Sequence, residues 1–209
     1  QKYNIPLIID DTIATFYNVN ILPYADIIIS SLTKFFSGKS DVMAGSLILN
    51  PNSKFYRELK KYFNDKFNDN LYVRDAAILC NNCQDFARRM QNINYNSKEI
   101  YHFLNNLENS KISEIYDQFK SNTASGYSGL LSICFFKDSD AKEFYNKINL
   151  AKGPSLGNDF TLICPYTLLA HYNELEFAKN HGVDSHLIRI SIGAEPLDYL
   201  INQFKEALL

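Results

Sequence analysis

The sequence lacks long hydrophobic runs, an excess of one charge, and the many cysteines of a disulfide-rich domain. No apolar stretch approaches the roughly 20 residues that a membrane helix needs, so we expect no membrane association. Its 21 basic and 23 acidic residues leave a formal net charge of −2, so the sequence does not show the excess of basic residues that is typical of nucleic-acid binding. The four cysteines favour a reducing compartment over a disulfide framework, which predicts a cytoplasmic protein.

The composition is that of an ordinary globular protein, because 46% of the residues are hydrophobic and 14% are aromatic. A length of 209 residues allows one large domain or two small ones. The chain opens at Gln1 with neither a Met nor a signal peptide, so we expect that this is not a native N-terminus. The apolar run of residues 5–9 follows closely, and such a strand needs neighbours to bury both of its faces.

Hydrophobic patterning predicts alternating strands and helices in the first half and a smaller α+β layer after it. Strands are expected at residues 7–10, 27–30, 46–49, 130–136, 161–164 and 187–192. A helix is expected to open at residues 51–53 and run through 62, and further helices are expected at residues 74–107 (with room for a short break at 94–96), 141–148 and 197–208.

Polar side chains follow two of the predicted strands, which is where open α/β sheets bind their ligands. Asp10 ends the first strand, and Ser31, Thr33 and Lys34 follow the second. Pyridoxal phosphate requires a Schiff-base lysine, hydroxyls for its phosphate and a carboxylate for its ring nitrogen, and these residues offer all three. On these residues alone, an ordinary helix cap after a strand remains an alternative for residues 31–34.

Two other motifs suggest different chemistry. Residues 38–40 read G-K-S, the end of a phosphate-binding P-loop, but that loop also needs a glycine where Thr33 stands. Cys80 and Cys83 have the spacing of a redox or zinc motif, yet no second Cys or His pair completes a metal set. We therefore expect neither a nucleotide site nor a metal site.

Several segments together resemble the pyridoxal-phosphate enzymes of cysteine and methionine metabolism. Residues 10–15 (D-D-T-I-A-T) match the family pattern D-N-T-x-A-T, and residues 24–45 match its pattern around S-x-T-K and G-H-S-D-V. Residues 153–157 (G-P-S-L-G) and 187–195 (L-I-R-I-S-I-G-A-E) match later signatures, in order and at family spacing. Residues 161–174 are similar to the fungal cystathionine γ-synthase branch of this family.

The resemblance implies a role for each matching residue. Lys34 would be the catalytic Schiff-base lysine and Asp10 the partner of the ring nitrogen, while Ser31 and Thr33 would bind the phosphate. Arg189 would hold the substrate carboxylate, a task for which a planar guanidinium suits, with Ser155 beside it. From the residues alone, Arg189 could equally be a solvated charge on one face of a strand.

The chain departs from the family pattern at two places. Asp11 stands where the family has Asn, which leaves the cofactor-binding Asp10 intact. Many members read G-G-V-E-S where residues 157–161 read G-N-D-F-T, so Phe160 replaces the glutamate. Asp159 could compensate for that loss or be an ordinary loop acid, and substrate preference therefore does not transfer from lyases or bacterial synthases.

The resemblance also implies the architecture and the activity. The expected fold is a type I, aspartate aminotransferase-like α/β enzyme, with residues 1–104 ending the large cofactor domain and 105–209 forming a small α+β domain. The expected reaction joins an activated homoserine ester and cysteine into cystathionine, with O-acetylhomoserine sulfhydrylase and cystathionine lyase as alternatives. A homodimer or homotetramer acting on small amino acids is implied. The glycine turn, stacking aromatic and Tyr/Arg pair of the family's N-terminal half are absent from the sequence, so a catalytically incomplete fragment is a further alternative.

Overall fold

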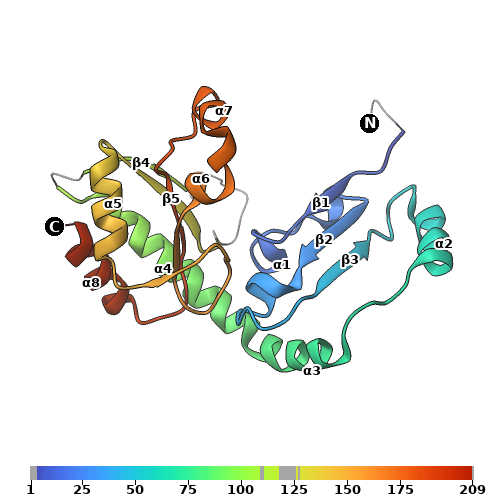
Figure 1. Cartoon of the computed structure of the whole chain (residues 1–209). Helices are drawn as coiled ribbons and strands as arrows, with labels where there is room; N and C mark the ends of the chain where they lie inside the picture. The colour runs from blue at the N-terminus through green and yellow to red at the C-terminus, as the bar shows by residue number, and fades with distance from the viewer. Residues whose placement is uncertain (1–3, 109–110, 118–125, 127, 209) are drawn as a thin grey trace.

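Two lobes joined by one long helix make up the computed structural model, which describes residues 4–108, 111–117, 126 and 128–208 (Figure 1). The first lobe contains β1 (Ile8–Asp10), α1 (Thr15–Asn18), the 3₁₀ turn η1 (Leu22–Tyr24), β2 (Ile27–Ser31), the π-helical turn η2 (Leu32–Phe36), β3 (Gly45–Leu49), α2 (Tyr56–Lys66), α3 (Val73–Asn82) and the 3₁₀ turn η3 (Cys83–Asp85). The linking helix is α4 (Phe86–Asn105). The second lobe contains β4 (Ile112–Tyr116), β5 (Leu130–Phe135), α5 (Asp138–Lys147), β6 (Ala151–Lys152), β7 (Leu162–Pro165), α6 (Tyr166–Ala170), the 3₁₀ turn η4 (Tyr172–Glu174), α7 (Leu175–Asn180), β8 (Ile188–Ser191) and α8 (Leu197–Leu208).

The first sheet has the strand order β1-β2-β3. β1 and β2 run parallel with Asp10 opposite Ile29, so the carboxyl ends of both strands lie at one edge, as the sequence predicts. β3 returns antiparallel to β2 after the turn that carries Lys34, with Gly45 opposite Ser31. The sheet therefore presents Asp10 and the Lys34 turn on the same side.

The second sheet has the order β4-β5-β8-β7-β6, with β6 and β7 parallel and the other neighbours antiparallel. Its core continues into α8, whose residues Leu200, Phe204 and Leu208 recur every fourth position and are all buried. This spacing places them on one helical face, and the bounds of α8 coincide with the predicted helix. Both sheets with their helices make a mixed α/β architecture.

Helix α4 contributes to both hydrophobic cores. Phe86, Met90 and Ile93 pack with Phe35 beside the Lys34 turn. Ile100 and Leu104, about two and three turns beyond Ile93, pack into the core of the second lobe. The helix therefore fixes the Lys34 turn relative to the second sheet, while the domain boundary at residues 104 and 105 stays a prediction.

The long helical stretch predicted at residues 74–107 breaks at a different place. α4 runs unbroken through residues 94–96, and the break falls at η3 between α3 and α4. β4 and β6 were not predicted, because β4 (I-S-E-I-Y) interrupts its apolar residues with polar ones and β6 has only two residues. In the described part of the chain, no helix is long and apolar enough to cross a membrane.

Candidate active site

Lys34 lies in the π-helical turn η2 that directly follows β2. Its backbone (φ −84°, ψ −128°) is not helical, and the turn closes through hydrogen bonds from Ser37 N to Leu32 O (3.0 Å) and from Gly38 N to Lys34 O (2.8 Å). The next side chain, Phe35, is fully buried. Phe35 thus anchors the turn in the core, and the neighbouring Lys34 side chain is half-buried.

The amine of Lys34 reaches the second lobe. Lys34 Nζ donates to the hydroxyl of Ser155 across 3.3 Å. The Nη2 nitrogen of Arg189 donates to the backbone oxygens of Pro154 and Ser155, the latter at 3.1 Å, and the guanidinium lies 4.8 Å from the Tyr166 ring. Three residues predicted for the site therefore meet, although more than 150 positions separate the first from the last in the sequence.

The ends of β1 and β2 are joined through Thr12, a residue with no predicted role. Asp10 Oδ1 accepts a hydrogen bond from Thr12 N (2.9 Å), and Thr12 Oγ1 accepts one from Ser31 N (2.8 Å). An open cavity of about 670 Å³ lies here, lined in part by Asp10, Thr12 and Ser31. The signal in the sequence was the D-x-T spacing, because an Asp side chain commonly binds the backbone two residues on.

Thr33 is a predicted phosphate ligand whose hydroxyl already has backbone partners. Its Oγ1 accepts a hydrogen bond from Ala44 N (3.1 Å) and lies 3.4 Å from Ala44 O. These contacts tie the Lys34 turn to the start of β3. A phosphate contact by Thr33 would have to share the hydroxyl with Ala44.

Asp11, the first departure from the family pattern, is not among the residues that line this open cavity and lines a second, smaller cavity of about 430 Å³ instead. It is 5% exposed, and its Oδ1 atom is buried without a hydrogen-bond partner among the described residues. Burial, with a smaller contribution from the charge of Asp10, raises the pKa of Asp11 from 3.8 to about 6. Asp10 and Asp11 therefore differ in environment, and Asp10 is the one that lines the larger opening at the strand ends.

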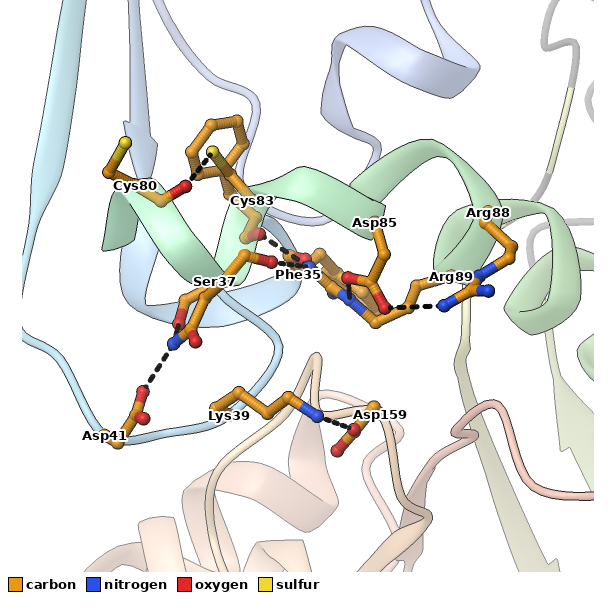
Figure 2. Close-up of polar contacts among 12 residues, drawn as sticks. Phe35, Ser37, Lys39, Asp41, Cys80, Cys83, Asp85, Arg88, Arg89 and Asp159 are labelled. Atoms are coloured by element: carbon orange, nitrogen blue, oxygen red, sulfur yellow. Dashed lines mark hydrogen bonds and ion pairs between the residues drawn. The ribbon is translucent and has the colours of Figure 1, made fainter. Parts of the chain in front are cut away.

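The loop at residues 157–161 closes against the Lys34 turn. Gly157 has φ +81°, and a Cβ there would lie 2.5 Å from Phe35 N and 2.9 Å from the carbonyl carbon of Lys34. Asp159, which belongs to the second departure from the family pattern, forms an ion pair with Lys39 (Figure 2). Its backbone N–H donates to Gly38 O (2.8 Å). Asp159 thus links the two lobes, and Phe160 is partly exposed beside it.

The other motifs are engaged within the protein. Lys39 of the G-K-S tripeptide pairs with Asp159, and Ser40 Oγ donates to Asn158 Oδ1 (2.7 Å), so both hold the loop at residues 157–161. Cys80 and Cys83 at the end of α3 are free thiols, with Cys83 Sγ donating to Cys80 O at 3.3 Å.

The donor set fits pyridoxal phosphate. A carboxylate (Asp10) and a hydroxyl (Ser31) line one open cavity, and a primary amine (Lys34) follows on the same chain segment and contacts a hydroxyl of the other lobe (Ser155). An aldehyde needs the amine, a pyridine nitrogen needs the carboxylate, and a phosphate is bound by hydroxyls and backbone N–H groups. The arrangement can thus support chemistry at the α-carbon of an amino acid held near Arg189.

Comparisons with known proteins point to one family of enzymes. The family model of the Cys/Met metabolism PLP-dependent enzymes matches residues 1–209. The chain is 41% identical over 224 residues to cystathionine gamma-synthase of Saccharomyces cerevisiae, with 99% of this chain and 35% of that protein covered. It is 43% identical over 216 residues to cystathionine gamma-synthase of Neurospora crassa, with 100% of this chain and 35% of that protein covered. The chain thus spans about a third of the length of these curated relatives.

Solved structures share the fold. A cystathionine gamma synthase from Xanthomonas oryzae, in complex with aminoacrylate and cysteine, gives a TM-score of 0.85 at 18% identity over 99% of this chain and 56% of that chain. A cystathionine gamma-lyase from Lactobacillus plantarum, complexed with L-serine, gives 0.83 at 22% identity over 96% and 55%. The predicted fold class is confirmed, and the chain belongs to the family of pyridoxal-phosphate-dependent enzymes of cysteine and methionine metabolism.

Proposed function

We propose that the protein containing this chain is a transsulfuration enzyme that forms cystathionine from an activated homoserine ester and cysteine by γ-replacement. The contact that carries the proposal is Lys34 Nζ to Ser155 Oγ, with Arg189 bound to the backbone of the same serine. Family membership and the names of the two fungal relatives support this reaction over others of the same fold. Because the chain spans only a third of those relatives, the activity is proposed for the whole protein.

Asp10, Ser31, Thr33 and Lys34 are proposed to hold pyridoxal phosphate. When bound, the cofactor supplies a ring that withdraws electrons from the α-carbon of an attached amino acid. Asp10 would keep the ring nitrogen protonated, because two charges about 4 Å apart at an effective dielectric constant of about 20 attract by roughly 4 kcal/mol. Ser31 and Thr33 would place the phosphate beside the start of the Lys34 turn.

Arg189 is proposed to bind the α-carboxylate of the substrate. A guanidinium matches a carboxylate with paired N–H groups, and its contacts with Pro154, Ser155 and Tyr166 fix its plane. A carboxylate bound there lies on the Ser155 side of the site, where the Lys34 amine is also found. Lys34 Nζ would then remove the proton from the α-carbon and return it at a neighbouring carbon.

Product analysis with the complete protein tests the reaction. O-acetylhomoserine is supplied with cysteine, with sulfide or alone, and cystathionine is supplied in a fourth reaction. Cystathionine should form from the ester and cysteine, and Lys34→Ala should abolish it. A protein that only cleaves cystathionine, or that uses sulfide but not cysteine, would refute the synthase proposal in favour of a lyase or a sulfhydrylase.

We further infer a homodimer or homotetramer in the cytoplasm, acting on small amino-acid substrates. The family resemblance supports the assembly, and the four free cysteines of the chain support a reducing compartment. Light scattering after gel filtration measures the assembly, and a monomeric mass would contradict it. Fractionation of cells with an antibody to the protein tests its location.

A further inference from the structure

A buried arginine lies directly beneath the segment that carries Lys34. Arg89 of α4 is 3% exposed, although arginine is almost never fully buried unless its charge is paired. Its Nε atom donates to Asp85 Oδ1 (2.7 Å), which balances the charge, and this hydrogen bond lowers the pKa of Asp85. Figure 2 shows Arg89 and Asp85 beside Phe35.

The remaining donors of Arg89 bind backbone oxygens of the Lys34 turn and of α3. Nη1 donates to Phe35 O (2.9 Å), and Nη2 donates to Phe36 O (2.9 Å) and to Asn82 O (3.0 Å). The last carbonyls of a helical segment have no partner within it, and burying them unpaired is costly. Arg89 therefore satisfies the carbonyls of the two residues that follow Lys34.

Neighbouring groups reinforce this arrangement. Asn82 Nδ2 donates to Ser37 Oγ (3.0 Å) and to Asp41 Oδ1 (2.9 Å), so the end of α3 holds the far side of the same turn. Gly38 has φ +74°, and a Cβ there would collide with the guanidinium of Arg89. The break between α3 and α4 at η3 thus places Asn82, Asp85 and Arg89 around one loop.

We propose that Arg89 is a positioning residue, which acts through the carbonyls of Phe35 and Phe36 to aim the Lys34 amine at the cofactor and at Ser155. This inference rests on the proposed function of Lys34 but adds a residue that touches neither cofactor nor substrate. A planar guanidinium reaches three carbonyls and a carboxylate at once, whereas the three donors of a lysine leave from one atom. Arg89→Lys should therefore retain the positive charge but lose some of the hydrogen bonds that hold the Lys34 turn in position.

The test follows covalent attachment of pyridoxal phosphate to the complete apoenzyme. Attachment is trapped with borohydride at intervals, and the modified Lys34 peptide is quantified by mass spectrometry, with circular dichroism reporting the folded fraction. Loss of charge-assisted hydrogen bonds predicts that Arg89→Met slows attachment by about tenfold or more per folded molecule, and Arg89→Lys by about threefold or more. In the complete enzyme both variants should lower kcat and leave the KM for the amino acid nearly unchanged, because Arg189 is untouched.

Arg88→Met is the matched control. Arg88 is the adjacent residue of α4 and also contacts Asp85 (3.4 Å), but its side chain is 75% exposed. As a surface change it should leave the attachment rate within about twofold. Arg89 variants that melt at a lower temperature but attach the cofactor at the wild-type rate would overturn the proposal. If Arg89→Met does not fold, the attachment rate of Arg89→Lys tests the proposal in its place. Borohydride-trapped pyridoxal phosphate on another lysine of Lys34→Ala, to the extent seen in the wild type, would instead refute the proposed role of Lys34.

Discussion

The amine of Lys34 and the hydroxyl of Ser155 meet across the two lobes, 3.3 Å apart. Neither lobe contains this pair by itself, since Lys34 follows β2 of the first sheet and Ser155 lies between β6 and β7 of the second. Contacts on either side hold the pair together: α4 packs into both cores, and Gly157 lies against the backbone of Lys34 and Phe35. Chemistry at Lys34 therefore depends on residues of both lobes.

Replacing Ser155 by Ala removes the hydroxyl but keeps the backbone oxygen that binds Arg189. Because a single hydrogen bond of this kind contributes about 0.5–1.5 kcal/mol, kcat/KM should fall by roughly twofold to tenfold. Steady-state kinetics of the complete enzyme measure the change. Ser155→Thr retains the hydroxyl and should recover most of the loss, and an Ala variant with unchanged kinetics would remove Ser155 from the site.

Replacing Arg189 by Lys should affect substrate binding more strongly. Lysine cannot hold the carbonyls of Pro154 and Ser155 and also present paired donors to a carboxylate, and it loses the flat contact with Tyr166. Loss of a hydrogen bond to a charged group, about 1.5–3 kcal/mol, predicts a KM raised by roughly tenfold to a hundredfold. Arg74→Lys, an exposed change on α3, is the control. An equal KM in both variants would contradict the proposed role.

Gly157 and Gly182 form a matched pair for testing the contact between loop and turn. Both have left-handed backbone, with φ +81° and +79°, so alanine suffers the same conformational penalty of about 1–2 kcal/mol at either site. At Gly157 the new Cβ would also press on Phe35 N and Lys34, whereas at Gly182 it would meet nothing within 4 Å. Gly157→Ala should therefore lower the melting temperature further and weaken cofactor attachment, and equal effects in both variants would show that the close approach is unimportant.

The sequence predicted the parts of the fold that depend on local patterning. Leu200, Phe204 and Leu208 specify α8 by spacing alone, and the runs ending at Asp10 and Ser31 specify β1 and β2. The family motifs then led to Lys34, Ser155 and Arg189, which the structure brings together. Their roles in binding remain predictions.

What the sequence did not predict depends on contacts between distant segments. The break at η3 has no Pro or Gly to mark it, and it coincides with Asn82 and Arg89 folding around the Lys34 turn. From the sequence, Asp159 could be an ordinary loop acid, and only the fold shows its ion pair with Lys39. Thr12 is one hydroxyl in a motif, and only the pairing of β1 with β2 shows that it joins their ends.

Asp11 makes stability depend on pH in a predictable direction. Its pKa is raised from 3.8 to about 6 by burial and by Asp10, so the folded state holds the proton more tightly than the unfolded chain. Below pH 3.8 both states are protonated and folding incurs no penalty from this group. Between pH 3.8 and about 6 the unfolded chain has lost this proton while the folded protein still holds it, so the penalty grows across this range. Above pH 6 the carboxylate is charged in both states and the penalty is complete, at most about 3 kcal/mol for a pKa raised by about two units.

Asp11→Asn, which restores the family pattern, should therefore stabilise the protein at pH 7 and have little effect near pH 4. Urea unfolding at several pH values gives the difference in free energy of unfolding between variant and wild type, which should grow between pH 4 and 6 and then level off. Asp65→Asn, an exposed change on α2, should show no such step. A difference that is the same at every pH would mean that the Asp11 carboxylate is charged and satisfied in the folded protein.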